Sequence, residues 1–158
     1  MKVLANDGIS QSGIDALQAK GFEVITTNVA QEQLISYINE NEVTVLLVRS
    51  ATTARKELVD SCPSLKIVGR GGVGMDNIDV DYAREKGLKV INTPASSSAS
   101  VAELVFAHLY GGVRFLHDSN RNMPLEGESN FKGLKKAYAK GIELRGKTIG
   151  IIGFGRIG

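Results

Sequence analysis

Short apolar runs of strand length alternate with segments of helical period in the first part of the chain. The apolar runs, which we expect to be strands, are residues 3–5, 24–25, 43–48, 65–68 and 88–91. Between them, apolar residues recur at helical spacing around residues 14–20, 34–38, 55–61 and 80–86. Strands joined by helices in this order form an open parallel sheet that is covered on both faces. The pattern therefore predicts an α/β fold.

Polar and glycine-rich residues follow the predicted strands. Asn6-Asp7-Gly8 follows the first strand, Arg49-Ser50 the third, residues 69–74 the fourth, and Asn92-Thr93-Pro94 the fifth. In open parallel sheets, ligands bind beyond the carboxyl ends of the strands. We therefore expect these loops to share one edge of the sheet and to form a cleft.

The loop at residues 69–74 has four glycines around Arg70. Because glycine allows close backbone approach and positive φ, such a loop can aim several N–H groups at an anion, and Arg70 would add charge. A tight strand-to-helix turn explains the same residues equally well. Arg49, on the neighbouring strand end, offers a guanidinium fork for a carboxylate or phosphate, although a solvated loop arginine is the simpler interpretation. Together the two arginines favour an anion pocket at this edge.

The pattern changes after the fifth strand. An S-x-x-E capping box at residues 100–103 precedes apolar residues at helical spacing, which predicts a helix as far as Leu116. Residues 119–146 are polar with scattered glycines, and we expect a long connection or arm there. Residues 147–152 are expected to form a sixth strand. Residues 153–158, GFGRIG, then fit the GxGxxG fingerprint of dinucleotide-binding folds, which requires a strand before it.

Composition narrows the classes of partner. Apolar residues make up 42% and charged residues 23%, which is typical of a chain that folds around a core. A net charge of +2 argues against nucleic acid or an anionic membrane as a partner, and no apolar stretch is long enough to span a membrane. The lone Cys62 cannot form an internal disulfide, and the N-terminus has no export signal, so a reducing cytoplasm is expected.

Metal and histidine chemistry have little support in the sequence. The single cysteine and the two histidines, His108 and His117, are not spaced as ligands, so no metal site is predicted. His108 lies on the apolar side of the helix predicted from Ser100, where an interior or interface histidine is favoured over a catalytic one. His117 falls near the end of that helix, where it would cap the last carbonyls.

Five stretches of the chain form a recognisable series. They are Val48-Arg-Ser-Ala-Thr52, residues 69–79 (GRGGVGMDNID), Asn92-Thr-Pro94, Ser100-Val-Ala-Glu-Leu104 and residues 143–158 (ELRGKTIGIIGFGRIG). In this order they closely resemble the D-isomer-specific 2-hydroxyacid dehydrogenases, over essentially the whole chain. The resemblance implies a flavodoxin-like doubly wound parallel sheet, the substrate-binding lobe, at residues 1–95. It further implies that residues 96–158 are the start of an incomplete NAD-binding domain, namely the opening helix and first strand of a truncated Rossmann domain.

The resemblance also implies a function and a set of site residues. The parent would be an oxidoreductase that uses NAD to oxidise a small anionic D-2-hydroxy acid. The two arginines favour 3-phospho-D-glycerate, oxidised to 3-phosphohydroxypyruvate, over glycerate, glyoxylate or lactate. The substrate-binding residues would be Arg49, Ser50, Arg70, Gly71, Gly72, Val73 and Gly74. The cofactor-binding residues would be Val73, Gly153, Gly155, Arg156, Ile157 and Gly158.

Catalysis and assembly are expectations of the same kind. The family's catalytic arginine, glutamate and histidine come after the glycine fingerprint, so they are expected beyond Gly158, and the chain alone is expected to be inactive. The helix from Ser100 resembles part of the family's dimer contact, which implies a homodimer or higher homo-oligomer. An alternative of another class is a noncatalytic binding or dimerisation fragment. The choice between NAD and NADP stays open.

Overall fold

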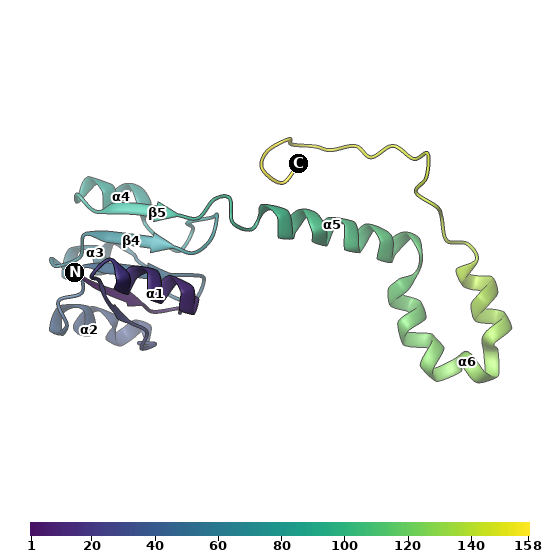
Figure 1. The fold of residues 1–158 in the computed structure, drawn as a ribbon, viewed down its shortest axis with the longest axis horizontal. Helices are drawn as coiled ribbons and strands as arrows, with labels where there is room; N and C mark the ends of the chain where they lie inside the picture. The colour runs from purple at the N-terminus through teal and green to yellow at the C-terminus, as the bar shows by residue number, and fades with distance from the viewer. The chain divides into compact units, whose positions relative to one another are not determined.

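The computed structural model describes residues 1–158 and divides the chain into two units, Met1–Ser96 and Ser97–Gly158. Five strands of the first unit form one sheet: β1 (Lys2–Ala5), β2 (Glu23–Ile25), β3 (Val45–Val48), β4 (Ile67–Arg70) and β5 (Lys89–Asn92). The connections contain α1 (Gln11–Ala19), the 3₁₀ turn η1 (Gln31–Gln33), α2 (Leu34–Glu40), α3 (Lys56–Ser61) and α4 (Val80–Glu85) (Figure 1).

The strand order in the sheet is β2-β1-β3-β4-β5, and every neighbouring pair is parallel. This is the strand order of flavodoxin-like folds. It places the carboxyl ends of β1 and β3 side by side at the point where the chain reverses its direction across the sheet, which is where such folds bind ligands. The predicted α/β fold with a flavodoxin-like parallel sheet is therefore confirmed for the first unit.

The hydrophobic core lies on the face of the sheet that α2, α3 and α4 cover. Leu46 of β3 and Val68 of β4 are completely buried there. They belong to one cluster with Leu34 and Ile38 of α2 and Leu58 of α3. The apolar stripes of three short helices thus meet the alternate residues of the central strands, as the helical and strand periods of the sequence require.

The opposite face of the sheet is less covered. Leu47, Gly69 and Ile91 are register partners on β3, β4 and β5, and they alternate with the core residues along each strand. Helix α1 contributes no buried residue, and Ile91 is 44% exposed. This open apolar strip reaches the carboxyl edge of the sheet, beside the loops that carry the candidate site residues.

Strand β4 ends later than the sequence pattern predicted. Gly69 and Arg70, expected in a loop, pair with Leu47 and Val48 of β3. A β-carbon at position 69 would lie 2.8 Å from the Cδ2 atom of Leu47 and 3.3 Å from Ile91. Glycine therefore marks a place where neighbouring side chains cross the strand, and its turn-forming tendency misled the interpretation.

The second unit contains two helices, α5 (Ser98–Val113) and α6 (Leu116–Tyr138). The expected opening helix is present, but it begins before the S-x-x-E pattern, with Ser97 at its N-cap. Within the expected connection or arm, residues 119–138 are helical apart from a kink at Asn130.

A few contacts made by residues of α6 help to hold this polar segment as a helix. Leu134 of α6 is the one buried apolar side chain of this unit. The rings of Phe115 and Tyr138 lie 6.0 Å apart, and the side-chain amide of Asn122 donates to the Tyr138 hydroxyl at 3.1 Å. Tertiary packing of a few residues therefore outweighs the low helix propensity of the glycines and the proline in this stretch.

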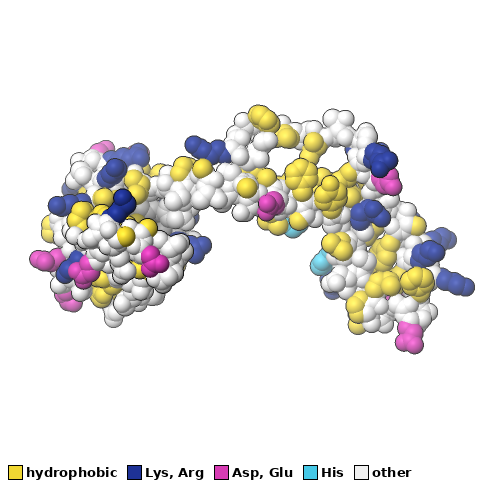
Figure 2. All heavy atoms as spheres, viewed as in Figure 1, with side chains coloured by type: hydrophobic (Ala, Val, Ile, Leu, Met, Phe, Trp, Pro, Cys, Tyr) yellow, Lys and Arg dark blue, Asp and Glu magenta, His cyan; other side chains and the backbone are white.

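The expected sixth strand is not formed. Residues 147–152 have no regular secondary structure, and Ile149, Ile151 and Ile152 are each more than half exposed. A strand is held by hydrogen bonds to a neighbouring strand, and the second unit contains no strand. Figure 2 shows apolar side chains on the visible surface of this unit. Leu104 and Val105 of α5 are 56% and 49% exposed. None of the helices has the length and apolarity that a membrane span requires.

Candidate functional site

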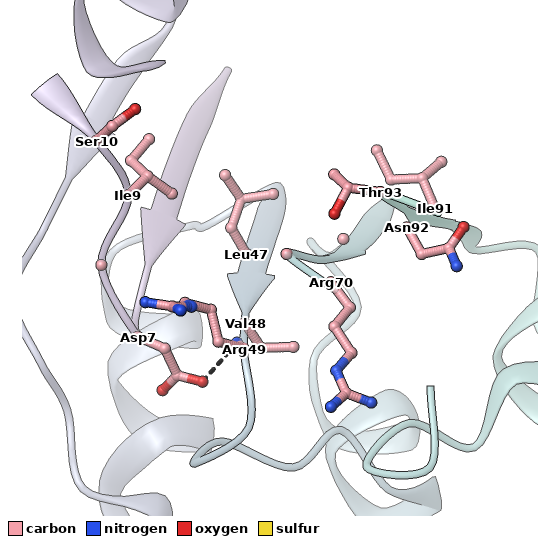
Figure 3. A pocket seen from close by; sticks show the side chains of 13 residues that line it. Asp7, Ile9, Ser10, Leu47, Val48, Arg49, Arg70, Ile91, Asn92 and Thr93 are labelled. Atoms are coloured by element: carbon pink, nitrogen blue, oxygen red, sulfur yellow. Dashed lines mark hydrogen bonds between the residues drawn. The ribbon is translucent and has the colours of Figure 1, made fainter. Parts of the chain in front are cut away.

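A cleft of about 670 Å³ opens at the carboxyl edge of the sheet in the first unit (Figure 3). Its floor includes the apolar strip of Leu47, Gly69 and Ile91. Its rim is formed by residues that end or follow β1, β3, β4 and β5, namely Asp7, Gly8, Ser10, Arg49, Arg70, Gly71, Asn92 and Thr93. Because parallel strands end at the same edge, the structure gathers the loops that the sequence pattern assigned to one cleft.

The candidate substrate residues divide into three groups. Arg49, Arg70 and Gly71 line the cleft. Ser50 lies outside it and lines, together with Arg49, an adjoining hollow of about 530 Å³. The remaining three residues, Gly72, Val73 and Gly74, line neither space.

Arg49 is a cleft residue whose charged side chain is unpaired. Its guanidinium makes no ion pair or side-chain hydrogen bond within the protein, and the residue is exposed. The stem of its side chain rests against Gly71, where a β-carbon would lie 3.5 Å from the Cγ atom of Arg49. A free guanidinium fork on a supported stem is suited to bind a carboxylate or a phosphate through two parallel hydrogen bonds.

Arg70 is held differently. Its Nη1 atom donates to the carbonyl of Gly74 at 2.5 Å and to the Asp76 carboxylate at 2.6 Å, and its side chain is only 14% exposed. The hydrogen bond from Arg70 lowers the pKa of the exposed Asp76 carboxyl. Arg70 pairs in register with Val48, so its side chain leaves the sheet on the face opposite to Leu47.

The two guanidinium groups therefore do not converge, contrary to the expectation of one pocket with two arginines. Figure 3 shows that Arg49 extends toward the loop of Asp7, whereas Arg70 turns away from Leu47 and Ile91. The physical reason is the alternation of side chains along a strand: a residue at the end of β4 and a residue just beyond β3 differ by one position in register.

The glycine-rich loop after β4 lies against the Arg70 side chain. None of the glycines from Gly69 to Gly74 has a positive φ. β-Carbons at Gly72 and Gly74 would each lie 3.4 Å from the guanidinium of Arg70. The loop thus wraps the Arg70 side chain. Its N–H groups at Val73 and Gly74 make no hydrogen bond within the protein.

Asp7 organises the loop that carries Arg49. Its carboxylate accepts hydrogen bonds from the backbone N–H groups of Arg49, at 2.6 Å, and Thr52, at 3.1 Å, and from the Thr52 hydroxyl. Partial burial pulls the pKa of Asp7 upward, but these hydrogen bonds outweigh it and hold the pKa below its usual value. Sequence reasoning placed Asp7 at the edge without assigning it a role; its position directly after β1 was the available signal.

Ionisation of Asp7 predicts a pH-dependent stability. A carboxyl whose pKa is lower in the folded state contributes stability above its unfolded pKa of about 4 and loses it as the pH falls through the folded value. Asp7→Asn should therefore lower the free energy of unfolding more at pH 7 than at roughly pH 3. Urea denaturation of both proteins at the two pH values measures this, and equal losses at both would contradict it.

All the candidate cofactor residues except Val73 lie in the other unit. Residues 153–158 are exposed, and Gly153 has a φ of 89°, the left-handed conformation that favours glycine. Both histidines are exposed and line one hollow between residues of α5 and α6. No group of three or more His, Cys, Asp or Glu residues is arranged to hold a metal ion.

A doubly wound parallel sheet with a polar cleft at its carboxyl edge defines a class of small-ligand-binding α/β proteins. Comparison with known proteins narrows this class. The sequence profile described as "D-isomer specific 2-hydroxyacid dehydrogenase, catalytic domain" matches residues 3–145. The chain belongs to this family.

Individual relatives agree with this assignment. The chain is 39% identical to D-3-phosphoglycerate dehydrogenase of Methanocaldococcus jannaschii, over 100% of the chain and 29% of the relative. It is 40% identical to hydroxypyruvate reductase of Thermotoga maritima, over 99% of the chain and 49% of the relative. The structure of NAD-dependent formate dehydrogenase from Staphylococcus aureus in complex with NAD matches with a TM-score of 0.73 and 27% identity, over 99% of the chain and 50% of that protein. The chain thus spans half or less of the length of these relatives.

Proposed function

We propose that residues 1–95 are the substrate-binding lobe, and residues 96–158 the beginning of the cofactor-binding domain, of an NAD-dependent D-2-hydroxyacid dehydrogenase. The parent protein would oxidise 3-phospho-D-glycerate to 3-phosphohydroxypyruvate. Identity of 39% to a D-3-phosphoglycerate dehydrogenase along the whole chain supports this substrate. In the reaction, NAD when bound accepts the hydride from C2, and the hydroxyl proton passes to a base.

The free guanidinium of Arg49 is the observation that carries the proposal. It lies on the rim of the cleft, at the switch point of the sheet, and it forms no ion pair within the protein. An unpaired arginine is suited to hold the carboxylate or phosphate of a small hydroxy acid. Ser50 and the free N–H groups of Val73 and Gly74 would supply further hydrogen-bond donors. Arg70, Gly71 and Gly72 would maintain the conformation of the loop after β4.

For the cofactor, the proposal uses the glycine turn. Gly153 and Gly155, with Arg156, Ile157 and Gly158, would hold the pyrophosphate of NAD, and Val73, which is 53% exposed, would face the nicotinamide. The positive φ of Gly153 suits the first glycine of such a turn. The NAD complex of the formate dehydrogenase, at 27% identity, supports the choice of cofactor.

We further propose that this chain alone does not catalyse hydride transfer. The residues of the first unit that line the cleft include no histidine that could take the hydroxyl proton. The exposed apolar side chains of α5 support a homodimer or higher homo-oligomer. A cytoplasmic location rests on the lone, buried Cys62, whose thiol pKa burial raises to about 11.

Titration of the isotope-labelled chain with 3-phospho-D-glycerate and with D-glycerate tests the proposal. We expect the amide signals of Arg49 and Ser50 to shift with both ligands. The phosphorylated acid should bind at least about tenfold more tightly, because one more charged hydrogen-bonded group is worth roughly 1.5 kcal/mol or more. Failure of both ligands to shift these signals would exclude the cleft as the substrate site.

A second candidate substrate is an unphosphorylated hydroxy acid. The 40% identity to a hydroxypyruvate reductase favours it, and so does the separation of the two guanidinium groups, which leaves a single free arginine in the cleft. Equal affinity for D-glycerate and 3-phospho-D-glycerate in the same titration would support this candidate over the phosphorylated substrate.

A further inference from the structure

The buried polar side chains of the protein are concentrated around one loop. Three polar residues are buried: Asn6 is 3% exposed, Thr52 4% and Asn77 6%. Each of them makes a hydrogen bond to, or belongs to, the segment from Arg49 to Thr52. Burying a polar group costs free energy unless it is hydrogen-bonded, so this concentration indicates a specific task for these side chains.

The N–H side of the loop is held from the end of β1. The Asp7 carboxylate accepts from the N–H groups of Arg49 and Thr52. Its neighbour Asn6 donates to the Thr52 hydroxyl at 2.8 Å, and its amide group also exchanges two hydrogen bonds with the backbone of Val29. The Thr52 hydroxyl, which donates to Asp7, is thus also held by the buried side-chain amide of Asn6.

The C=O side of the same loop is held from the segment after β4. The side-chain amide of Asn77 donates to the carbonyl of Arg49 at 2.9 Å and to the carbonyl of Thr52 at 2.7 Å. Its own Oδ1 atom is buried and has no partner. Asn77 therefore uses both hydrogens of its side-chain amide on the loop.

We propose that Asp7 and Asn77 are positioning residues that fix the direction of the Arg49 guanidinium. This rests on the proposed function of Arg49 as the anion-binding group. Asp7 binds the N–H groups of Arg49 and Thr52, and Asn77 binds the C=O groups of the same two residues; each of these two sets of hydrogen bonds is called a grip on the loop. Asn77 also ties the Arg49 loop to the glycine loop after β4, which lies a few residues earlier in the chain. The two loops that would hold the substrate are thereby connected through one side chain.

The physical effect of the grip is preorganisation. Arg49 and Ser50 are exposed and follow the last paired residue of β3, so their backbone has few other contacts. Ordering a free loop upon binding costs conformational entropy for each residue that is fixed. A loop that is already held binds an anion without that cost, and loss of either grip should reduce affinity by about tenfold.

Two variants and two matched controls test the proposal in the full 158-residue chain. Asp7→Asn and Asn77→Ala each remove one grip. Asp79→Asn removes the same charge and a carboxylate that accepts from the Lys56 N–H farther along the same segment. Asn41→Ala removes an amide that donates to the Tyr37 carbonyl at the end of α2. Each protein is titrated with 3-phospho-D-glycerate after urea denaturation has shown that it is folded.

We expect Asp7→Asn and Asn77→Ala to bind about tenfold more weakly than wild type, and the controls to bind within about twofold, even where their unfolding midpoints fall as far. Removing the Asp7 charge would by itself strengthen anion binding, so weaker binding reports lost position. Equal affinity of the variants and the controls would overturn the proposal. If Asp7→Asn does not fold, Thr52→Val and Thr52→Ser replace it, with weaker binding expected for valine alone.

Hydrogen exchange separates this proposal from the proposed function. Exchange of the Arg49 and Thr52 amides should become at least about tenfold faster in Asp7→Asn, while amides of β3 keep their protection. Unchanged exchange would overturn the grip whatever the ligand. If wild type binds no hydroxy acid but exchange accelerates as expected, the substrate assignment fails and the grip on the loop stands.

Discussion

A Leu46→Ala variant is expected to unfold more easily than the wild-type chain by about 2–5 kcal/mol, which is the usual cost of truncating a fully buried leucine. Leu46 is completely buried on β3, which pairs with β1 on one side and with β4 on the other. Its side chain belongs to the cluster that joins the sheet to α2, α3 and α4. The cavity left by truncation would open where rigid elements surround it and cannot collapse.

Two control variants are compared with Leu46→Ala. Leu46→Met conserves volume and should cost less than about 1.5 kcal/mol. Leu125→Ala makes the same chemical change at a side chain that is 82% exposed, and its cost should be a few tenths of a kcal/mol at most, roughly. Urea denaturation followed by circular dichroism measures all three. A midpoint for Leu46→Ala equal to that of Leu125→Ala would show that β3 is not the centre of the core.

The fold of the first unit could be predicted because local pattern and tertiary structure agree there. The apolar run at residues 43–48 is typical of a buried central strand, and β3 occupies its last four residues. The helix expected around residues 80–86 is α4, which ends at Glu85 just before Gly87, a glycine with a positive φ of 86°. Where glycine served close packing instead, as at Gly69 in β4, the boundary was misplaced.

The second unit shows what sequence pattern leaves out. Residues 119–138 have glycines, a proline and many polar side chains, yet they are helical, with Leu134 buried and the Tyr138 ring close to that of Phe115. Residues 147–152 have the composition of a strand, but a strand needs a hydrogen-bonding neighbour that local sequence cannot supply. The helix at residues 119–138 and the absence of a strand at residues 147–152 do not follow from local sequence, because each depends on contacts with other parts of the chain.

The candidate site was predictable in its location and not in its geometry. Loops after parallel strands share an edge, so the gathering of Asp7, Arg49 and Arg70 follows from topology alone. The direction of Arg70 depends on strand register, and a shift of one residue reverses it. The role of Asn77 was hidden because an asparagine between Asp76 and Asp79 reads as a turn residue, whereas its burial and its two carbonyl partners appear only in three dimensions.

Arg49→Gln is expected to weaken binding of 3-phospho-D-glycerate by about 10- to 100-fold, since hydrogen bonds to charged groups contribute roughly 1.5–3 kcal/mol. The guanidinium of Arg49 has no partner within the protein, so its removal leaves no buried group unsatisfied and should hardly change the free energy of unfolding. Arg49→Lys keeps the charge and loses the planar fork, so an intermediate affinity is expected.

Arg55→Gln is the matched control, because it removes the same charge from the same segment. Arg55 is half exposed, and its guanidinium is committed to the Asp79 carboxylate and the Asp76 carbonyl. It should bind the ligand within about twofold of wild type, because a surface charge that is already paired and screened by salt contributes little at a distance. If calorimetric titration found the two glutamine variants equally weakened, the anion would be attracted by the net charge of the segment, and the Arg49 fork would not be its binding group.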